Sequence, residues 1–355
     1  MNIQPNRFHG IVRVLFRTIV IVILTLTFTL EIYTFAVQGE GDSPLPPLFG
    51  NFENNRAALE KVQQEGEFSF AVVGDTRSVG TFERIVDELR NIRLDFAFLL
   101  GDCSYDGTEE DHRYFRAECA DEYALPFPVF YVVGNHDVSP ESFPIRRFEE
   151  AYGPSIFSFE YRQCLFIVLR TLNEPFTNEE SVNFLEKFRN ADLSKYRHTF
   201  VFLHIPPQVS PMFVARTYSE SEQLVKLFDE LGIEYVFAGD FHGYAQTKLR
   251  KTTYIVTGGG GAHLNEEKGK QFHHALVVRV TPDSFDKHIV VMPRVNDVED
   301  RLEKLAISEI WPWMQRHAYL AIGLNVAGIA IFITLLAPPL VRLIRRKKIS
   351  SLIVL

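Results

Sequence analysis

The chain has 355 residues, of which 46% are hydrophobic and 23% charged, and its formal net charge at pH 7 is −8. That length and apolar content suffice for one large α/β domain with accessory segments. No basic stripe lies between the two ends of the sequence, which argues against nucleic acid as a partner. Three cysteines without a CxxC pair exclude a disulfide framework.

Residues 1–37 predict a cytoplasmic N-terminus followed by a transmembrane helix. Three arginines precede the apolar run 18–30, and Glu31 follows it. Basic residues before a short apolar segment and acidic residues after it are typical of a signal peptide or of a signal anchor. Residues 34–39 (TFAVQG) offer a poor cleavage site. We therefore favour an uncleaved anchor, with cleavage as the alternative.

A Pro/Gly-rich linker and a short helix occupy residues 38–64, and a strand-rich domain follows over residues 65–295. Apolar runs predict strands at 68–74, 95–101, 128–134, 164–170, 199–204, 234–239, 253–261 and 275–281. Helical patterns lie between several of them, at 81–92, 181–190 and 219–232. Strands that alternate with helices indicate an α/β domain, and such short apolar runs are typical of strands covered on both faces. The 31 phenylalanines and 13 tyrosines predict a bulky aromatic core.

The C-terminal part predicts a second membrane segment. Residues 296–317 form a charged juxtamembrane helix in this reading, and residues 318–341 then carry no charge over a full bilayer length. A basic tail follows at 342–355. By the positive-inside rule both termini are cytoplasmic, which places the domain outside the cytoplasm, in the periplasm or the extracellular space. The alternative for residues 318–341 is a buried core helix.

Polar side chains follow five of the predicted strands at the point where each strand ends. They are Asp75, Asp102 with Tyr105, Asn135 with His136 and Asp137, His204, and Asp240 with His242. In open α/β sheets, ligands bind at the carboxyl ends of the strands. A glycine often stands just before the polar residue and allows a sharp turn. Any one of these positions alone fits an ordinary turn or helix cap; five of them predict a shared site.

The residue types in this set indicate a metal centre. Carboxylates, imidazoles, an amide oxygen and a phenol suit Mn, Fe or Zn. The set holds more ligands than one catalytic ion needs, because such an ion keeps open positions. Two ions that share a carboxylate fit the number of ligands. Paired ions of this kind clamp the attacking and leaving oxygens of a phosphoryl transfer.

The motifs GDTR, GDCSY, GNHD, FLHIPP and GDFH, in this order, resemble those of the calcineurin-like metallophosphoesterases, which include the purple acid phosphatases. The resemblance spans about residues 68 to 282. It implies an α/β fold, a four-layer αββα sandwich with mixed β-sheets, which the two predicted transmembrane helices would flank here.

The resemblance also implies a role for each residue. Asp75 and His242 would bind the first metal, Asp102 would bridge both ions, and Asn135 and His204 would bind the second. A metal-bound hydroxide would attack the phosphorus.

His136 would act on the phosphate or on the leaving group, and Asp137 would orient His136.

Two positions depart from the family pattern. Arg77 stands where many members have a histidine ligand, and it cannot give up its proton to bind a metal. Tyr105, in a GDxxY motif, either supplies the missing ligand or only packs. Asp240 replaces a histidine and can still bind the second metal through oxygen, which favours Mn or Fe over Zn. We expect Arg77 to lie near Asp240 or near the bound phosphate and to serve catalysis there.

These features together predict a membrane-anchored, dinuclear metal-dependent phosphoric ester hydrolase. Its substrates would be phosphate mono- or diesters of a small molecule or of a lipid-linked group. The alternative is an inactive binding or scaffold protein of the cell envelope that keeps the fold. Such a protein predicts broken ligands, and here only Arg77 clearly breaks the pattern. Cys119 and Cys164 can pair in an oxidising compartment if their geometry allows it.

Overall fold

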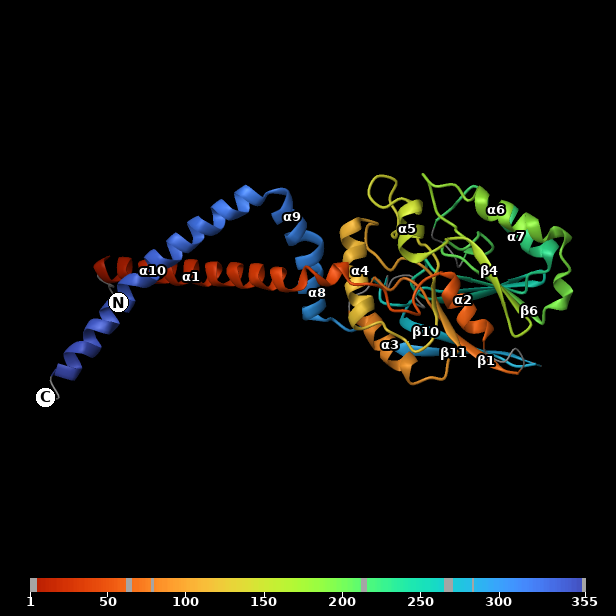
Figure 1. Cartoon of the computed structure of the whole chain (residues 1–355), viewed down its shortest axis with the longest axis horizontal. Coiled ribbons are helices and arrows are strands. Elements are labelled where there is room, and N and C mark those ends of the chain that lie inside the picture. Colours follow the sequence, from red (N-terminus) through yellow and green to blue (C-terminus); the bar gives the residue numbers. More distant parts are fainter. Residues whose placement is uncertain are drawn as a thin grey trace. The chain divides into compact units, whose positions relative to one another are not determined.

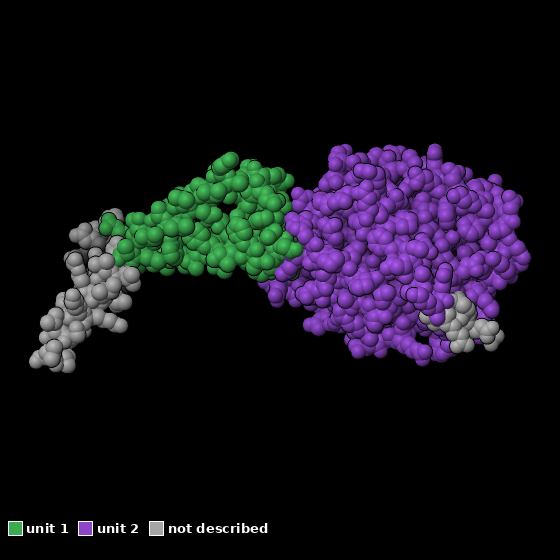
Figure 2. Space-filling view, in the orientation of Figure 1, with its two compact units in different colours: residues 1–39, 303–355 green, residues 40–302 purple. Residues whose placement is uncertain are grey.

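The computed structural model describes residues 5–61, 66–77, 80–211, 216–264, 271–282 and 284–352. The chain divides into two compact units, one of residues 1–39 with 303–355 and one of residues 40–302 (Figure 2). The larger unit contains the whole segment 65–295 that we predict as the phosphoesterase domain. The short helix expected before residue 64 is α2, Glu53–Glu60. The last residues of that prediction lie outside the described part of the chain.

Two mixed β-sheets form the centre of the larger unit (Figure 1). In the described chain the first sheet has the order β11-β10-β1-β2-β3. Its strands are β1 (Phe68–Val73), β2 (Phe96–Leu99), β3 (Val129–Tyr131), β10 (His273–Val280) and β11 (Phe285–Met292). The second sheet has the order β4-β5-β6-β7-β9-β8. Its strands are β4 (Phe157–Tyr161), β5 (Cys164–Val168), β6 (His198–Phe202), β7 (Tyr235–Ala238), β8 (Tyr244–Leu249) and β9 (Thr252–Thr257).

The strands that carry the predicted site run parallel. β1 pairs with β2 and β2 with β3 in parallel, with Val73 opposite Leu99 and Leu99 opposite Tyr131. β5, β6, β7 and β9 are likewise parallel neighbours in the second sheet. The carboxyl ends of neighbouring parallel strands therefore meet at one edge of each sheet, where ligands bind in such folds.

Helices cover the outer face of each sheet. The first sheet packs against α3 (Thr81–Arg90), α4 (Glu109–Asp121) and α5 (Ile145–Tyr152). The second packs against α6 (Glu179–Glu186) and α7 (Ser221–Leu231). Alternate residues of each strand point to opposite faces. Val73 accordingly packs on the helix side, and Val72 packs between the sheets. The result is the expected order of layers, helix, sheet, sheet and helix.

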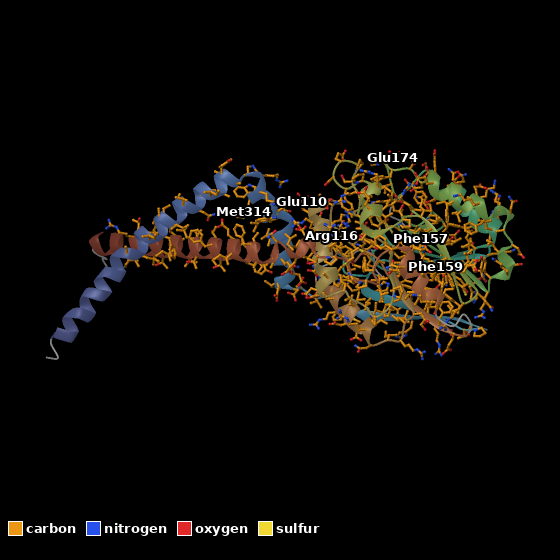
Figure 3. All side chains as sticks on the ribbon, in the orientation of Figure 1. Glu110, Arg116, Phe157, Phe159, Glu174 and Met314 are labelled. Atoms are coloured by element: carbon orange, nitrogen blue, oxygen red, sulfur yellow. The ribbon has the colours of Figure 1, made fainter. Side chains whose placement is uncertain are left out.

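Aromatic side chains fill the space between the two sheets. Phe98 of the first sheet stacks on Phe202 of the second with ring centroids 3.7 Å apart. Phe70 is fully buried and has Phe96 stacked 5.4 Å away on its own sheet. Phe159 of the edge strand β4, labelled in Figure 3, stacks on neighbouring rings of the same layer. The prediction of a bulky aromatic core is confirmed.

Three strands lie outside the sequence prediction, and each forms an edge of a sheet. They are β4, β8 and β11. One face of an edge strand meets solvent more often, so most residues of these three strands are partly or fully exposed. These strands therefore lack the continuous apolar runs by which we predicted the central ones. Helices α4 and α5 were also not predicted.

The three cysteines are free and buried. Cys119 lies on α4 in the cluster between the first sheet and its helices. Cys164 begins β5 and belongs to the cluster between the two sheets. The pairing of Cys119 with Cys164 that the sequence left open is therefore not formed, because the first sheet separates the two clusters.

The smaller unit contains two long apolar helices, α1 (Pro5–Val37) and α10 (Ala318–Leu352). By length and composition, the segments Ile11–Asp42 and Ala318–Ala337 are each able to cross a membrane. Within this unit, Phe28 contacts Phe332 edge-on at 6.2 Å. Membrane insertion and topology stay predictions.

The juxtamembrane segment 296–317 is helical but interrupted. It consists of α8 (Val298–Lys304), a π-helix (Leu305–Ile310) and α9 (Trp311–Arg316). The predicted basic tail continues α10 as far as Leu352, and residues 353–355 lie outside the described chain.

Candidate metal centre

The predicted site residues follow the carboxyl ends of strands in both sheets, and several have an unusual backbone. The angle φ is +59° at Asp75, +53° at Asp102, +64° at Asp240 and +49° at His242. Non-glycine residues in this region cost about 1–3 kcal/mol each and persist only where the surrounding structure requires them. Such residues gather at functional sites more often than elsewhere. The backbone thus turns sharply at the point where each of these side chains leaves its strand.

Gly101 shows why a glycine precedes such a residue. Its φ is +88°, and a Cβ atom there would lie 2.6 Å from the Cα of Gly134 and 2.8 Å from Nδ1 of His204. No real side chain tolerates such contacts. Glycine at this position therefore allows the loops after β2 and β3 to approach the end of β6.

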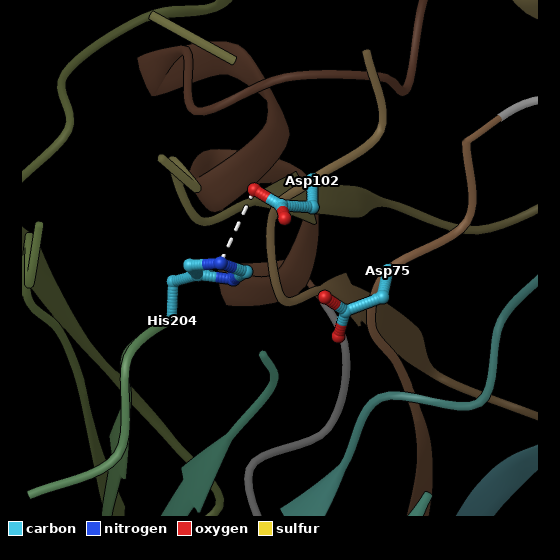
Figure 4. A group of neighbouring side chains, drawn as sticks. All are labelled: Asp75, Asp102 and His204. Carbon is cyan, nitrogen blue, oxygen red and sulfur yellow. Dashed lines mark ion pairs between the residues drawn. The ribbon is translucent and has the colours of Figure 1, made fainter. Parts of the chain in front are cut away.

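Asp75, Asp102 and His204 form the centre of the site (Figure 4). Each offers one ligand atom, these atoms all lie within 4.8 Å of one another, and all three residues are 0% exposed. His204 donates from Nδ1 to the carbonyl oxygen of Leu100 at 2.6 Å. Because of this bond, Nε2 of His204 faces the carboxylates. Nε2 lies 3.2 Å from Oδ1 of Asp102.

Three more of the predicted ligands join this group. Oδ1 of Asn135 lies 3.1 Å from Nε2 of His204. Nε2 of His242 lies 3.5 Å from Oδ1 of Asp75, and the backbone N–H of Asp240 donates to Oδ2 of Asp75 at 2.9 Å. Residues from both sheets thus converge on one point.

Two buried oxygens in this group lack hydrogen-bond donors. Oδ1 of Asp75 and Oδ2 of Asp240 accept no hydrogen bond from any described residue. Buried polar atoms normally have a hydrogen-bond partner, so two carboxylate oxygens without one indicate that another group, such as a cation, satisfies them. Carboxylate, imidazole and amide donors suit Mn, Fe or Zn. The residues present therefore fit a metal centre.

Asp137 has a different role from the one we expected. Its Oδ2 accepts the backbone N–H groups of Asp102 and Gly134, each at 2.8 Å. Its Oδ1 accepts those of Cys103 at 2.8 Å and Ser104 at 3.0 Å. Both oxygens are thus engaged by backbone groups. Asp137 fastens the loops after β2 and β3 to each other and does not orient the ring of His136.

The ring of His136 is oriented by a carbonyl group instead. Nδ1 of His136 donates to the backbone oxygen of Tyr105 at 2.6 Å. Nε2 consequently faces the site and lies 4.0 Å from Oδ2 of Asp102. His136 is partly exposed at the mouth of the site, so its Nε2 is accessible to a substrate.

Arg77 and Tyr105 lie side by side at the same mouth. Arg77 contacts Oδ2 of Asp102 at 3.5 Å and donates to the backbone oxygen of Tyr105 at 3.4 Å. Its guanidinium carbon lies 5.7 Å from the centroid of the Tyr105 ring. Burial raises the pKa of the Tyr105 phenol, and the charge of Arg77 opposes this effect. Metal ligation by Tyr105 stays a prediction.

Comparison with known proteins agrees with this arrangement. A family model described as calcineurin-like phosphoesterase matches residues 68–244, which include all of the strand-end residues named above. The chain belongs to the calcineurin-like phosphoesterase family. The serine/threonine-protein phosphatase CPPED1 of Bos taurus is 28% identical over 214 residues. That match covers 56% of this chain and 66% of the relative.

Solved structures show a likeness in fold. PhoD matches with a TM-score of 0.51 and 14% identity, over 66% of this chain and 67% of PhoD. A dimetal phosphatase from Danio rerio matches with a TM-score of 0.49 and 13% identity, over 65% of this chain and 98% of that one. The likeness to PhoD concerns the fold alone. The predicted mixed-sheet α/β phosphoesterase fold is confirmed.

The charges of His204 and Asp102 in this phosphoesterase site compensate each other. Burial lowers the pKa of His204, but the neighbouring Asp102 outweighs burial and raises that pKa to about 10. Burial opposes ionisation of Asp102, yet the charge and hydrogen bond of His204 lower its pKa. Burial raises the pKa of Asp240 against the opposing charges of His204 and Arg216. Metal binding to such a group displaces protons, as it does wherever ligands must be deprotonated.

Arg216 enters the phosphoesterase site without any signal in the sequence. Its Nη1 donates to Oδ1 of Asn135 at 2.9 Å and forms an ion pair with Oδ1 of Asp240. Its Nη2 lies 3.5 Å from Nε2 of His136. We expected Arg77 beside Asp240 or the phosphate, but Arg216 takes the place beside Asp240. No strand end or motif precedes Arg216, so only the folded chain brings it here.

A cavity of about 710 Å³ adjoins the site of this phosphoesterase at Arg216. It is lined by Asn173, Glu174, Phe176, Arg216, Thr217, Tyr218 and Ser219. Glu174, labelled in Figure 3, contributes a carboxylate, and Phe176 and Tyr218 contribute aromatic surface. Arg216 therefore belongs both to the candidate metal centre and to the wall of this cavity.

Proposed function

We propose that this protein is a membrane-anchored phosphoesterase with two metal ions and a catalytic domain outside the cytoplasm. The observation that carries the proposal is that two buried carboxylate oxygens, Oδ1 of Asp75 and Oδ2 of Asp240, accept no hydrogen bond from any described residue, although Asp75 belongs to the buried Asp75–Asp102–His204 group. Buried carboxylate oxygens without a hydrogen-bond donor are costly unless a cation satisfies them. The family to which the chain belongs supports the phosphoesterase part of this proposal.

Each residue of the group has a proposed share in holding the metals. Asp75 and His242 would hold the first ion, with Tyr105 as a further candidate ligand. Asn135, His204 and Asp240 would hold the second ion, and Asp102 would be shared by both.

The oxygen-rich set with Asp240 favours Mn or Fe over Zn. When bound, the ions supply positive charge at the phosphate and allow water to ionise near neutral pH.

The residues at the mouth of the site act on the substrate. Nε2 of His136 faces the site and is placed to pass a proton to the leaving oxygen of the ester. Arg216 presents a guanidinium beside His136, and such a group binds phosphate oxygens in a fixed geometry. Arg77 holds Asp102 in place and adds positive charge at the entrance. The cavity beside Arg216 accommodates the organic part of a phosphate mono- or diester.

Activity is tested on the full-length protein in detergent. The protein is stripped with a chelator and reloaded with Mn²⁺, Fe or Zn²⁺, and it is offered nitrophenyl phosphate, bis-nitrophenyl phosphate and a phosphoserine peptide. We expect metal-dependent hydrolysis of at least one ester, highest with Mn²⁺ or Fe, and none in Asp75→Asn. Bound metal without hydrolysis of any ester would favour the inactive scaffold instead.

The membrane topology has a separate test. The two apolar helices and the basic residues beside them support a domain outside the cytoplasm. Alkaline phosphatase fused after residue 290 should be active, and the same enzyme fused after residue 350 should be silent. An active fusion at the second position would contradict a cytoplasmic C-terminus.

A further inference from the structure

A second group of carboxylates lies away from the candidate metal centre. Glu83 in the first turn of α3, Glu122 at the end of α4 and Asp300 on α8 each offer one ligand atom. These atoms all lie within 4.8 Å of one another. None of the three residues takes part in the candidate metal centre. Three separate elements of the larger unit therefore bring negative charge to one point.

The buried member of this group has an unsatisfied oxygen. Asp300 is 6% exposed, and its Oδ2 accepts no hydrogen bond from any described residue. Glu83 accepts the backbone N–H of Gly80 at Oε1, at 2.8 Å. Within the described chain, no basic side chain forms an ion pair with Glu83, Glu122 or Asp300. A buried carboxylate oxygen without a hydrogen-bond donor is costly, and a cation bound to it would offset that cost.

The surroundings add negative charge and do not offset it. Burial and the neighbouring Asp300 raise the pKa of Glu83 to about 8. Burial likewise raises the pKa of Glu122, with Asp300, Asp121 and Asp297 adding to the effect. Carboxylates that crowd together in this way hold either a shared proton or a metal ion.

The segment before α8 is already fastened to the start of α3. The hydroxyl of Thr81 accepts the backbone N–H of Val295 at 3.0 Å. A Cβ atom on Gly80 would lie 3.1 Å from the backbone nitrogen of Asp297. Close packing here holds Asp300 beside Glu83, so the carboxylates are brought together by the fold itself.

We propose that Glu83, Glu122 and Asp300 form a calcium site that fastens α8 to α3 and α4. Ca²⁺ takes oxygen ligands at about 2.3–2.6 Å in flexible geometry, so two oxygens on one ion lie at most about 5 Å apart. The ligand atoms of the three carboxylates all lie within 4.8 Å of one another, which satisfies this limit. Mg²⁺ demands near-ideal octahedral geometry at shorter distances, which carboxylates from three separate elements meet less readily.

Calcium binding is tested on the full-length protein in detergent, with Ca²⁺ alone as the probe. Ligands that bind only the folded state raise the melting temperature. We expect Ca²⁺ to raise the Tm of the wild type by several degrees. The same shift should appear in Asp75→Asn, which disables the candidate metal centre. The Ca²⁺-induced rise in Tm should vanish in Asp300→Asn and in Glu122→Gln. Glu122 is partly exposed, so Glu122→Gln should fold normally.

Asp121→Asn is the matched control, because it removes one negative charge next to Glu122 from an exposed position. It should keep the full Ca²⁺ shift. Calorimetric titration of Ca²⁺ into Asp75→Asn should show one binding site. The double variant Asp75→Asn, Glu122→Gln should show no Ca²⁺ binding. A Ca²⁺ shift that survives both Asp300→Asn and Glu122→Gln would overturn the proposal. The absence of any Ca²⁺-induced change in the Tm of the wild type would also overturn it. In that case a proton shared between Glu83 and Asp300 would explain why the carboxylates lie so close together.

Discussion

The carboxylate of Asp137 accepts the backbone N–H of Asp102 at 2.8 Å, and so holds the loop that carries a central residue of the metal centre. The same oxygen accepts the N–H of Gly134, which joins the loop after β2 to the loop after β3. Asp137 therefore shapes the site without facing the substrate. From the sequence we expected Asp137 to orient His136, because Asp137 directly follows that residue.

Asp137→Asn should destabilise the whole domain. In the wild type each carboxylate oxygen of Asp137 accepts two backbone N–H groups. Asparagine replaces one of these oxygens with an NH2 group, which is a donor, so two backbone N–H groups lose their acceptor. Each buried donor left without a partner costs about 1–3 kcal/mol. We expect the free energy of unfolding in urea to fall by about 2–6 kcal/mol, together with a loss of bound metal. Unchanged unfolding with reduced activity would instead return Asp137 to a role in catalysis.

His136→Ala and Asn135→Ala should have different effects. In the proposed function His136 acts on the substrate and binds no metal, so His136→Ala should keep both metals and lose about a hundredfold or more in rate. Asn135 has its side-chain oxygen against His204, so Asn135→Ala should weaken the second metal. Metal content by elemental analysis and kcat are measured on the same samples. Loss of metal in His136→Ala but not in Asn135→Ala would show that the two roles are reversed.

Arg216→Ala should raise KM for phosphate esters far more than it lowers metal content. A charged hydrogen bond contributes about 1.5–3 kcal/mol, which corresponds to roughly a 10- to 100-fold rise in KM. Arg216→Lys should recover part of the loss, because lysine keeps the charge but not the paired geometry. Arg146→Ala is the matched control, since the Arg146 side chain is 87% exposed and pairs only with Glu150 among the described ion pairs. Equal effects of the two alanine variants would remove Arg216 from the site's function.

Asp240→His should change the metal preference. A histidine at this position replaces a hard oxygen donor with imidazole, which suits Zn²⁺ better. It also removes the acceptor that holds Arg216. We expect the ratio of Zn²⁺ to Mn²⁺ affinity to rise in competition binding. An unchanged ratio would exclude Asp240 as a metal ligand.

His112 should make the stability of the domain sensitive to acid. It donates to the backbone oxygen of Asp137 and contacts the hydroxyl of Tyr152, and burial lowers its pKa from 6.5 to about 3. The folded protein therefore binds fewer protons than the unfolded chain between these two values. Stability falls as the pH drops through this window, by about 1.4 kcal/mol per pH unit from this group.

The test compares the wild type with His112→Gln. The variant should be less stable at neutral pH, where it loses part of the hydrogen bonding of the histidine. Below pH 6.5 the gap in unfolding free energy between the two proteins should shrink, because the variant has no imidazole to protonate. Urea unfolding at a series of pH values measures this gap. A gap that stays constant down to acid pH would show that His112 is not the responsible group.

The central strands and the strand-end residues were predictable because their signals are local. Each central strand is buried on both faces, so its sequence is an apolar run, and a polar residue after it marks the strand's carboxyl end. Asp75, Asp102 and His204 could be named in this way, and the fold brings them together. The edge strand β8 could not be predicted, because most of its residues are partly or fully exposed and its sequence therefore lacks an apolar run.

Contacts between distant segments were decided only by the tertiary structure. Arg216 reaches Asp240 and Asn135 across long stretches of chain, and nothing in its neighbouring residues marks it. Asp137 was visible in the sequence, but the backbone N–H groups that it accepts are set by the packing of two loops. The sequence determined which chemical groups stand at the strand ends, because strand pattern and turn chemistry are local. The tertiary structure decided which groups they face, because a side chain's partners depend on how separate segments pack.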